Sequence, residues 1–273
     1  MKKKIMSMAL VTMLAVSASA LAAHYPYSTS KHGYGHGPKI NYGYNHVLRE
    51  KMIPDGRYYS GVAGKQYHKN NQIIAIRTIE IYQPVILNIH AISHGVGHVN
   101  HTLYDMEQNT IGRRINPQAN GVDDESMIIG PGFYELKSDF YSIKKDAYCE
   151  YRVKADAEVI ESNAPAEIYR PHYAHRLTLG MPVINYMPYE RNYSDKHQYY
   201  SFELFNGREV RLLANVLKGS CRFEILDTDE RVISDVYVNN KVAEKMFYLA
   251  PGKYYVRVYR YDKNGAVYRL KVD

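Results

Sequence analysis

The clearest strand pattern of the chain lies in residues 198–216, which read QYYSFELFNGREVRLLANV. Apolar and polar residues alternate before Asn206-Gly207 and alternate again after it. A period of two is typical of a β-strand with one buried face, and an Asn-Gly pair between two such runs is typical of a tight turn. The stretch therefore predicts two consecutive strands, with Tyr200, Phe202 and Leu204 on the buried face of the first.

The same framework of strands and turns occurs twice in the chain. Three pairs of segments match in the same order: Thr102–Ile111 with Phe223–Ile233, Gly130–Leu136 with Ala250–Val256, and Tyr151–Asp156 with Tyr268–Asp273. Matching segments lie about 120 residues apart, and the spacing drifts by only a few residues, as loop insertions would produce. A repeat of this length indicates a duplicated module.

Each copy is predicted to be all-β. Val85, Leu87 and Ile89 repeat in copy one the alternation seen after Gly207, and both Pro131-Gly132 and Pro251-Gly252 are turns that open a strand. About seven short strands in roughly 100 residues are typical of a two-sheet sandwich, whose facing apolar surfaces form the core. The predicted fold class is therefore all-β, with two tandem antiparallel, immunoglobulin-like β-sandwich domains.

These motifs resemble the bacterial pre-peptidase C-terminal (PPC) domain. Copy two carries the pattern in Tyr200–Leu204, Ile225–Asp227 and Pro251–Val258. Copy one departs from it, because Ala75–Arg77 replaces the aromatic motif and Ser138 replaces the last valine. The resemblance implies a jelly-roll-like sandwich that is usually an accessory to a secreted peptidase and, in some relatives, a binder of collagen or other polymers.

The N-terminus has the pattern of an export signal. Lys2, Lys3 and Lys4 precede the apolar run 5–16, and Ala20-Leu21-Ala22 supplies the small residues of a cleavage site. Roughly twelve apolar residues are too few to cross a bilayer core of about 30 Å as a helix. We expect a cleaved signal peptide, no membrane span, and a periplasmic or secreted protein.

The predicted organisation follows from these features and from the composition of the connecting segments. It consists of a signal peptide (1–22), a flexible His/Gly/Tyr-rich segment (23–54), β-sandwich module 1 (55–160), a linker (161–175) and β-sandwich module 2 (176–273).

Composition and motifs restrict the function classes. The formal net charge of +7 includes three signal lysines and is too mild for a nucleic-acid partner, which usually requires a concentrated basic face. Neither His-Glu-x-x-His nor Gly-x-Ser-x-Gly occurs. We expect a protein without catalytic activity; an enzyme with a site between the modules is the third alternative.

Histidine gives one candidate site. His90, His94, His98 and His101 lie within twelve residues of copy one, and the equivalent stretch of copy two has no histidine. Imidazole is a common ligand of zinc and copper, so a converging set would form a metal site. A solvated surface loop is the alternative, because the spacing matches no established zinc motif.

An acidic run gives a second candidate. Asp123, Asp124 and Glu125 follow a glycine-containing turn of copy one, and calcium prefers several oxygen ligands. A solvated turn is the alternative, because the spacing of an EF-hand is missing.

Cys149 and Cys221 are the only thiols, and they occupy different places in the two copies. Export favours oxidation, which would allow one disulfide between the modules. The sequence does not decide between this disulfide and two free thiols.

The last candidate is an exposed face of copy two. Tyr255, Arg257, Tyr259 and Tyr261 alternate with the apolar residues of one predicted strand and are expected to point outward. Tyrosine and arginine are frequent at binding hot spots, although cross-strand pairs on a wet sheet would have the same pattern. The leading hypothesis is an exported accessory protein that presents such a face to a protein or glycan; the alternative is a zinc- or copper-binding protein that uses the histidines.

Overall fold

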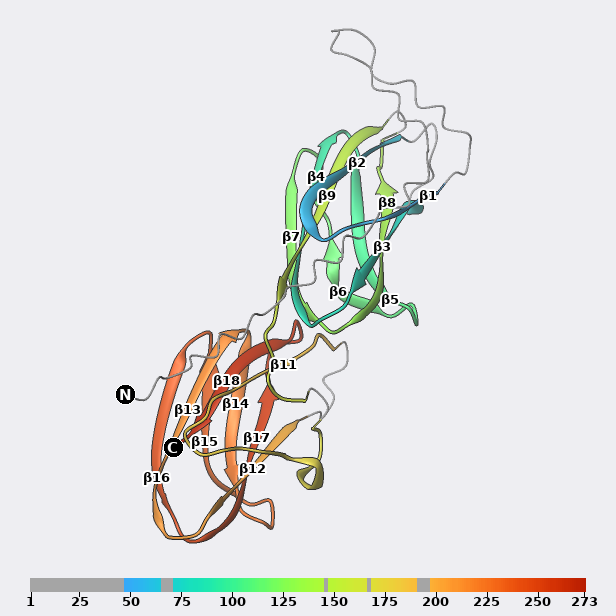
Figure 1. The fold of residues 1–273 in the computed structure, drawn as a ribbon. Helices are drawn as coiled ribbons and strands as arrows, with labels where there is room; N and C mark the ends of the chain where they lie inside the picture. The colour runs from blue at the N-terminus through green and yellow to red at the C-terminus, as the bar shows by residue number, and fades with distance from the viewer. Residues whose placement is uncertain (1–46, 65–70, 145–146, 166–167, 191–196) are drawn as a thin grey trace, which may run out of the picture. The chain divides into compact units, whose positions relative to one another are not determined.

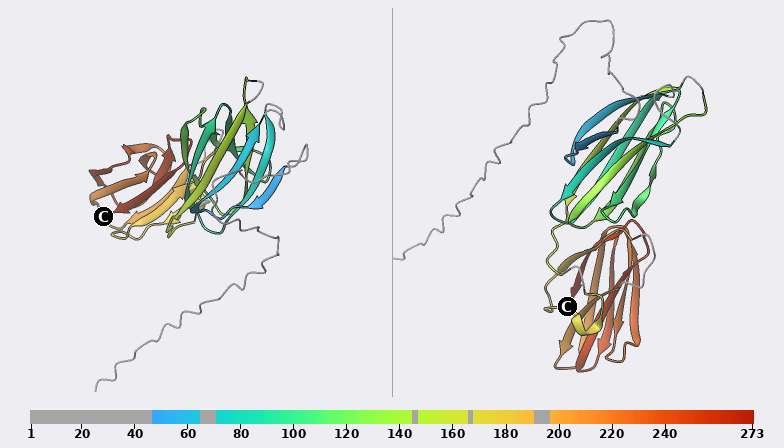
Figure 2. Two further views of the ribbon diagram at one scale, coloured as in Figure 1. Left: turned by 90° about the horizontal axis from the view of Figure 1, so that it is seen from above. Right: turned by 90° about the vertical axis from the view of Figure 1, so that its right-hand side faces the viewer.

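The computed structural model describes residues 47–64, 71–144, 147–165, 168–190 and 197–273. These residues form eighteen β-strands and one short 3-10 turn, Pro171–Tyr173, so the predicted all-β class is confirmed. The strands are arranged in four sheets, two in each half of the chain (Figure 1, Figure 2). The predicted signal peptide and most of the His/Gly/Tyr-rich segment lie outside the described residues.

The first sandwich packs a five-stranded sheet against a four-stranded one. The five-stranded sheet has the order β1 (Leu48–Lys51), β3 (Gln72–Ile81), β8 (Gly132–Tyr141), β5 (His98–Asp105), β6 (Thr110–Ile115). The four-stranded sheet has the order β2 (Asp55–Gly64), β9 (Tyr148–Val159), β4 (Val85–Gly95), β7 (Val122–Ile129). Except for the parallel β1–β3 pair, the strands of this sandwich pair antiparallel.

The second sandwich repeats this arrangement strand for strand. Its five-stranded sheet has the order β10 (His175–Arg176), β12 (Gln198–Leu204), β17 (Gly252–Arg260), β14 (Ser220–Leu226), β15 (Val232–Asn239). Its four-stranded sheet has the order β11 (Val183–Met187), β18 (Ala266–Val272), β13 (Arg208–Lys218), β16 (Val242–Leu249). Here too one pair, β10–β12, is parallel.

The cores follow the sequence alternation. Tyr200, Phe202 and Leu204 of β12 are buried against Val210 and Leu212 of β13, as the opening stretch predicts. In the first sandwich the same positions bring the apolar face of β4 against β3, β5 and β8. Burying two facing apolar surfaces is the main stabilising contribution to such a fold.

The Pro-Gly-x-Tyr motif has the same structural role in both copies. Gly132 and Gly252 both have a φ of 154°, a backbone conformation that favours glycine. Two residues later, the hydroxyl of Tyr134 donates to the carbonyl of Gly130, and that of Tyr254 donates to Ala250, each at 2.9 Å. The motif thus specifies the turn into β8 and β17 and a tyrosine that closes it.

Two segments pack more closely than the sequence suggested. Leu48–Lys51 was expected within the flexible segment 23–54, but it pairs in parallel with β3 and belongs to the first sandwich. In the expected linker 161–175, Ile168 is buried in the core of the second sandwich, and its carbonyl accepts a 2.8 Å hydrogen bond from the backbone of Tyr199. Both segments cover sheet edges that would otherwise lack a partner.

Among the described residues, no helix has the length and apolar character needed to cross a bilayer.

Candidate functional site

The four histidines of the candidate metal site lie in three different places. His90 and His94 are on β4, and both point out of the four-stranded sheet. His90 contacts the carboxylate of Asp124 on the neighbouring strand and lies edge-on to the ring of Tyr58, 5.9 Å away. The exposed His94 is placed opposite Glu150 of β9.

The other two histidines are on β5, in the opposite sheet. His98 lies on the outer face beside Tyr141, with ring centroids 5.2 Å apart, and burial together with the nearby Arg114 lowers its pKa. His101 points into the core, where its Nδ1 lies 2.9 Å from the hydroxyl oxygen of Ser138. Complete burial, reinforced by the charge of Arg77, lowers the pKa of His101 to about 3.

The predicted zinc or copper site is therefore corrected. His90, His94, His98 and His101 are close in sequence, but β4 and β5 belong to different sheets and strand alternation separates their side chains further. Within the described part of the chain, no three histidine, cysteine or acidic side chains gather as metal ligands would.

The predicted calcium loop is also corrected, because Asp123, Asp124 and Glu125 belong to strand β7. Asp123 and Glu125 share one face, and Arg113 bridges them at 2.6 Å and 2.7 Å. The hydrogen bond from Arg113 lowers the pKa of Asp123 to about 2, whereas burial raises that of Glu125. Asp124 points to the opposite face and contacts His90, so the three carboxylates do not converge on one point.

The two cysteines are free thiols, and the proposed disulfide is not formed in this structure. Cys149 is buried in a cluster with Val99 and Phe140, and Cys221 is buried in the core of the second sandwich. Burial raises the pKa of both, that of Cys149 to about 11, so neither is an activated nucleophile.

The outward-facing tyrosines of copy two are part of a larger cross-strand array. Strand β14 lies between β15 and β17, and its Arg222 pairs with Tyr237 on one side and with Tyr259 on the other. We call the whole array the tyrosine–arginine face; its members are Arg222, Glu224, Asp235, Tyr237, Arg257, Tyr259 and Tyr261.

Glu224 is the centre of this face. Its side chain is almost completely buried, yet its carboxylate accepts hydrogen bonds from Arg257 at 2.7 Å and from the hydroxyl of Tyr259 at 2.8 Å. Arg222 lies 3.5 Å from the same carboxylate and donates to Asp235 at 2.9 Å. One buried acid thus contacts two arginines and one tyrosine at the same time.

The rings of the face are contiguous. Tyr261 lies edge-on to Tyr237 at 5.2 Å and tilted against Tyr259 at 5.7 Å, and His197 lies 5.1 Å from Tyr259. The guanidinium of Arg222 is 5.9 Å from the centroid of the Tyr259 ring. Tyr237 and Tyr261 remain 53% and 44% exposed, so the array is open to solvent.

The tyrosine–arginine face includes more residues than the sequence predicted, and one predicted residue, Tyr255, lies apart from it. Arg257, Tyr259 and Tyr261 belong to it, whereas Tyr255 lies further along β17, where it contacts Lys253 with 5.1 Å between the ammonium and the ring. The members on β14 and β15 are not among the residues that the sequence pattern predicted. The sequence feature that could have identified those on β14 is the alternation of Arg222 and Glu224 with apolar residues. The fold alone determines which strands are neighbours.

Comparisons with known proteins show resemblance in fold only. No protein-family model matches the chain, and no curated protein matches it. Among solved structures, the chain is similar to the pre-peptidase C-terminal domain of a collagenase from Bacillus anthracis, with 22% identity and a TM-score of 0.32, over 41% of this chain and 99% of that one. That domain bears the family name suggested by the motifs, and it matches less than half of the chain, so it does not bear on the tandem arrangement.

Two further solved structures are similar over most of the chain. The PBSX exported protein XepA matches with 9% identity and a TM-score of 0.21, over 81% of this chain and 83% of that one. The CUB1-EGF-CUB2 domain of human MASP-1/3 matches with 8% identity and a TM-score of 0.23, over 78% of this chain and 99% of that one. Likenesses at these scores carry no functional argument.

Proposed function

We propose that this chain is an exported, non-catalytic binding protein that contacts a protein or glycan partner through the tyrosine–arginine face of its second sandwich. The observation that carries the proposal is the buried Glu224, which orients Arg257, Arg222 and Tyr259 beside the exposed rings of Tyr237 and Tyr261. Preorganised tyrosine and arginine side chains are the groups that contribute most at binding hot spots.

Within the described residues, the other candidate groups do not converge on one site. The histidines and the acidic residues that suggested metal chemistry are spread over different faces or occupied by Arg113, and both thiols are buried. The resemblance to PPC domains leads us to include in the proposal an accessory role beside a secreted peptidase. The N-terminal signal pattern leads us to include a periplasmic or extracellular location.

A pull-down from cell envelope and culture fluid tests the proposal. The mature protein is compared with a variant carrying Tyr237→Ser and Tyr261→Ser, which removes the two exposed rings and leaves Glu224 and its partners in place. A variant with Tyr82→Ser and Tyr248→Ser is the matched control, because these tyrosines are 75% and 72% exposed but lie outside the face. We expect the first variant to lose its partners and the control to keep them; equal recovery by all three proteins would remove the face from the account.

A further inference from the structure

The tyrosine–arginine face has a charge balance that indicates the class of its ligand. Arg222 and Arg257 are balanced by Glu224 and Asp235, and every one of these charges is paired within the face. A charged ligand would therefore gain little Coulomb energy from the face as a whole, and it would have to compete with existing ion pairs. The face is thus complementary to a ligand without net charge.

Its composition differs from that of a protein–protein interface core. Such cores are enriched in aromatic residues and arginine but depleted of acidic residues. Here two acids lie among the rings, and Glu224 occupies the centre with only 4% of its surface exposed. Charged groups surrounded by aromatic rings are better suited to a ligand that presents apolar patches and hydrogen-bonding groups side by side.

The geometry favours an extended ligand. The face runs across three neighbouring strands, β15, β14 and β17, which at the usual spacing span about 10 Å. Tyr237 and Tyr261 offer exposed rings that contact each other edge-on, and Arg222 and Tyr259 lie beside them on β14 and β17. A pyranose ring presents an apolar C–H face for stacking and hydroxyls at its edge, so a chain of sugars repeats both features along its length.

We infer that the tyrosine–arginine face binds a neutral polysaccharide. This inference rests on the proposed function and narrows its partner to one chemical class. Sugar rings stack on Tyr237 and Tyr261, while Arg222 and Arg257 donate to ring hydroxyls. Glu224 is a positioning residue, because it is covered by its partners and acts through the groups that it orients.

The first sandwich supplies an internal contrast. At the positions of Arg222 and Tyr259 it has Asn100 and Asp139, which are linked by a 3.2 Å hydrogen bond, and Asp139 also contacts Arg114. At the position of Arg257 it has Lys137. This face lacks the row of contiguous tyrosines, so we assign polysaccharide binding to the second sandwich alone.

Affinity electrophoresis of the mature protein tests the inference. The gels contain one of four polymers: β-1,3-glucan, mannan, hydroxyethyl cellulose or the anionic alginate; insoluble chitin and cellulose are tested by sedimentation. We expect retardation or sedimentation by at least one neutral polymer, a loss of tenfold or more in affinity with Tyr237→Ser/Tyr261→Ser, and less than a twofold change with Tyr82→Ser/Tyr248→Ser. Raising NaCl from 50 to 500 mM should change the affinity less than twofold, since no net charge is neutralised.

A conservative variant separates positioning from structure. Glu224→Gln keeps the shape of the side chain but removes the charge that aligns Arg222 and Arg257, so we expect an affinity loss of roughly three- to tenfold with both exposed rings intact. Far-UV circular dichroism and the urea unfolding midpoint check that the variant is folded.

The outcomes distinguish the ligand class from the binding face. If no neutral polymer binds but an immobilised envelope protein fraction retains the native chain and not the Tyr237→Ser/Tyr261→Ser variant, the polysaccharide assignment is overturned and the proposed function stands. If a neutral polymer binds native and variant protein equally, the assignment to this face is overturned. Binding only to alginate, lost at high salt, would contradict the charge argument.

Discussion

The two sandwiches have the same strand order but different polar groups at the centre of their cores. In the second, Tyr200 of β12 and Tyr268 of β18 meet hydroxyl to hydroxyl at 2.5 Å, and Asn185 donates to Tyr200 at 2.9 Å. In the first, the matching positions hold Arg77 and Tyr151, and Arg77 is completely buried. One core is built around neutral hydroxyls and the other around a cation.

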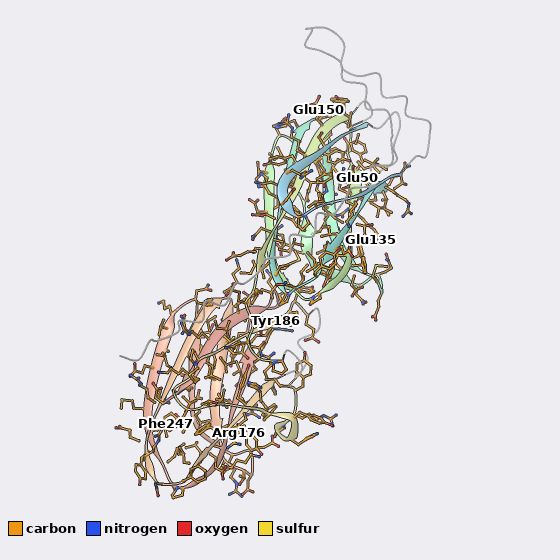
Figure 3. All side chains as sticks on the ribbon, in the orientation of Figure 1. Glu50, Glu135, Glu150, Arg176, Tyr186 and Phe247 are labelled. Carbon is orange, nitrogen blue, oxygen red and sulfur yellow. The ribbon has the colours of Figure 1, made fainter. Side chains whose placement is uncertain are left out.

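The residues around these polar groups also differ between the two sandwiches. Glu50 of β1, labelled in Figure 3, lies opposite Arg77 and accepts a 2.7 Å hydrogen bond from it, whereas His175 lies opposite Tyr200. The position of Phe223, which packs edge-on against Tyr268, is taken in copy one by His101. A buried arginine requires a carboxylate and hydrogen-bonding neighbours, so these substitutions form a linked set.

The same fold thus tolerates two solutions: a buried cation paired with a carboxylate, and buried hydroxyls that bond to one another. Their costs differ, because a buried ion pair depends on both partners and on pH, whereas a neutral network does not depend on acid. Four experiments test this difference between the two cores, in order of decreasing expected effect.

Acid should destabilise the first sandwich selectively. The pKa of His101 is lowered to about 3 in the folded state, so below pH 6.5 the unfolded chain takes up a proton there that the folded chain does not. Stability from this group is complete above pH 6.5 and falls as the pH drops toward 3, by about 3 kcal/mol between pH 7 and pH 4. Hydrogen exchange followed by mass spectrometry should show β3 and β5 losing protection before β12 and β14.

The variant His101→Phe introduces the residue that copy two has at this position. It should remove most of the acid-dependent loss, and an unchanged pH profile would show that His101 is not its source.

Breaking the buried ion pair should be nearly as costly. Glu50→Ala leaves Arg77 buried without a counter-charge, which should destabilise the first sandwich by about 2–3 kcal/mol; the one-third exposure of Glu50 allows water to moderate the loss. Urea unfolding combined with hydrogen exchange measures it. His175→Ala, at the matching position of copy two, should cost less than about 1 kcal/mol; equal costs would contradict the difference between the cores.

Removing one hydroxyl from the neutral network should have a smaller effect. Tyr200→Phe leaves Asn185 and Tyr268 each short of one partner, at a cost of about 1–2 kcal/mol in the second sandwich. Tyr151→Phe should cost less, because Arg77 reaches that hydroxyl only at 3.4 Å. The urea midpoints of the two variants give the comparison, and a larger effect of Tyr151→Phe would reverse it.

The shared turn should show the smallest difference. Gly132→Ala and Gly252→Ala place a side chain on the same φ of 154° with no close contact, so strain alone should cost each sandwich about 1 kcal/mol. Differential scanning calorimetry should find equal shifts. Unequal shifts would show that the two turns are not equivalent.

Much of the framework could be predicted because it depends on local pattern. Side chains along Tyr200–Leu204 alternate between the two faces of a strand because of the extended backbone alone. The pattern therefore indicates a strand and its buried face without knowledge of the adjacent strands. The Pro-Gly-x-Tyr motif likewise encodes a turn within a few residues, and its repetition identified the duplication.

The candidate sites depended on contacts that a linear pattern does not contain. Four histidines within twelve residues suggested a metal site. However, β4 and β5 belong to different sheets, and His101 is buried in the core. The acidic run suggested a calcium loop, yet Arg113 from the preceding strand pairs with two of its carboxylates.

By itself the sequence determined the all-β class, the repeat, the inward faces and three of the seven members of the tyrosine–arginine face. Only the tertiary structure placed β14 between β15 and β17, which brings Glu224 under Arg257 and Tyr259 and sets Arg222 between two tyrosines. The physical reason is that alternation depends on each residue's own strand, whereas pairing between strands depends on how the whole chain closes its two sheets.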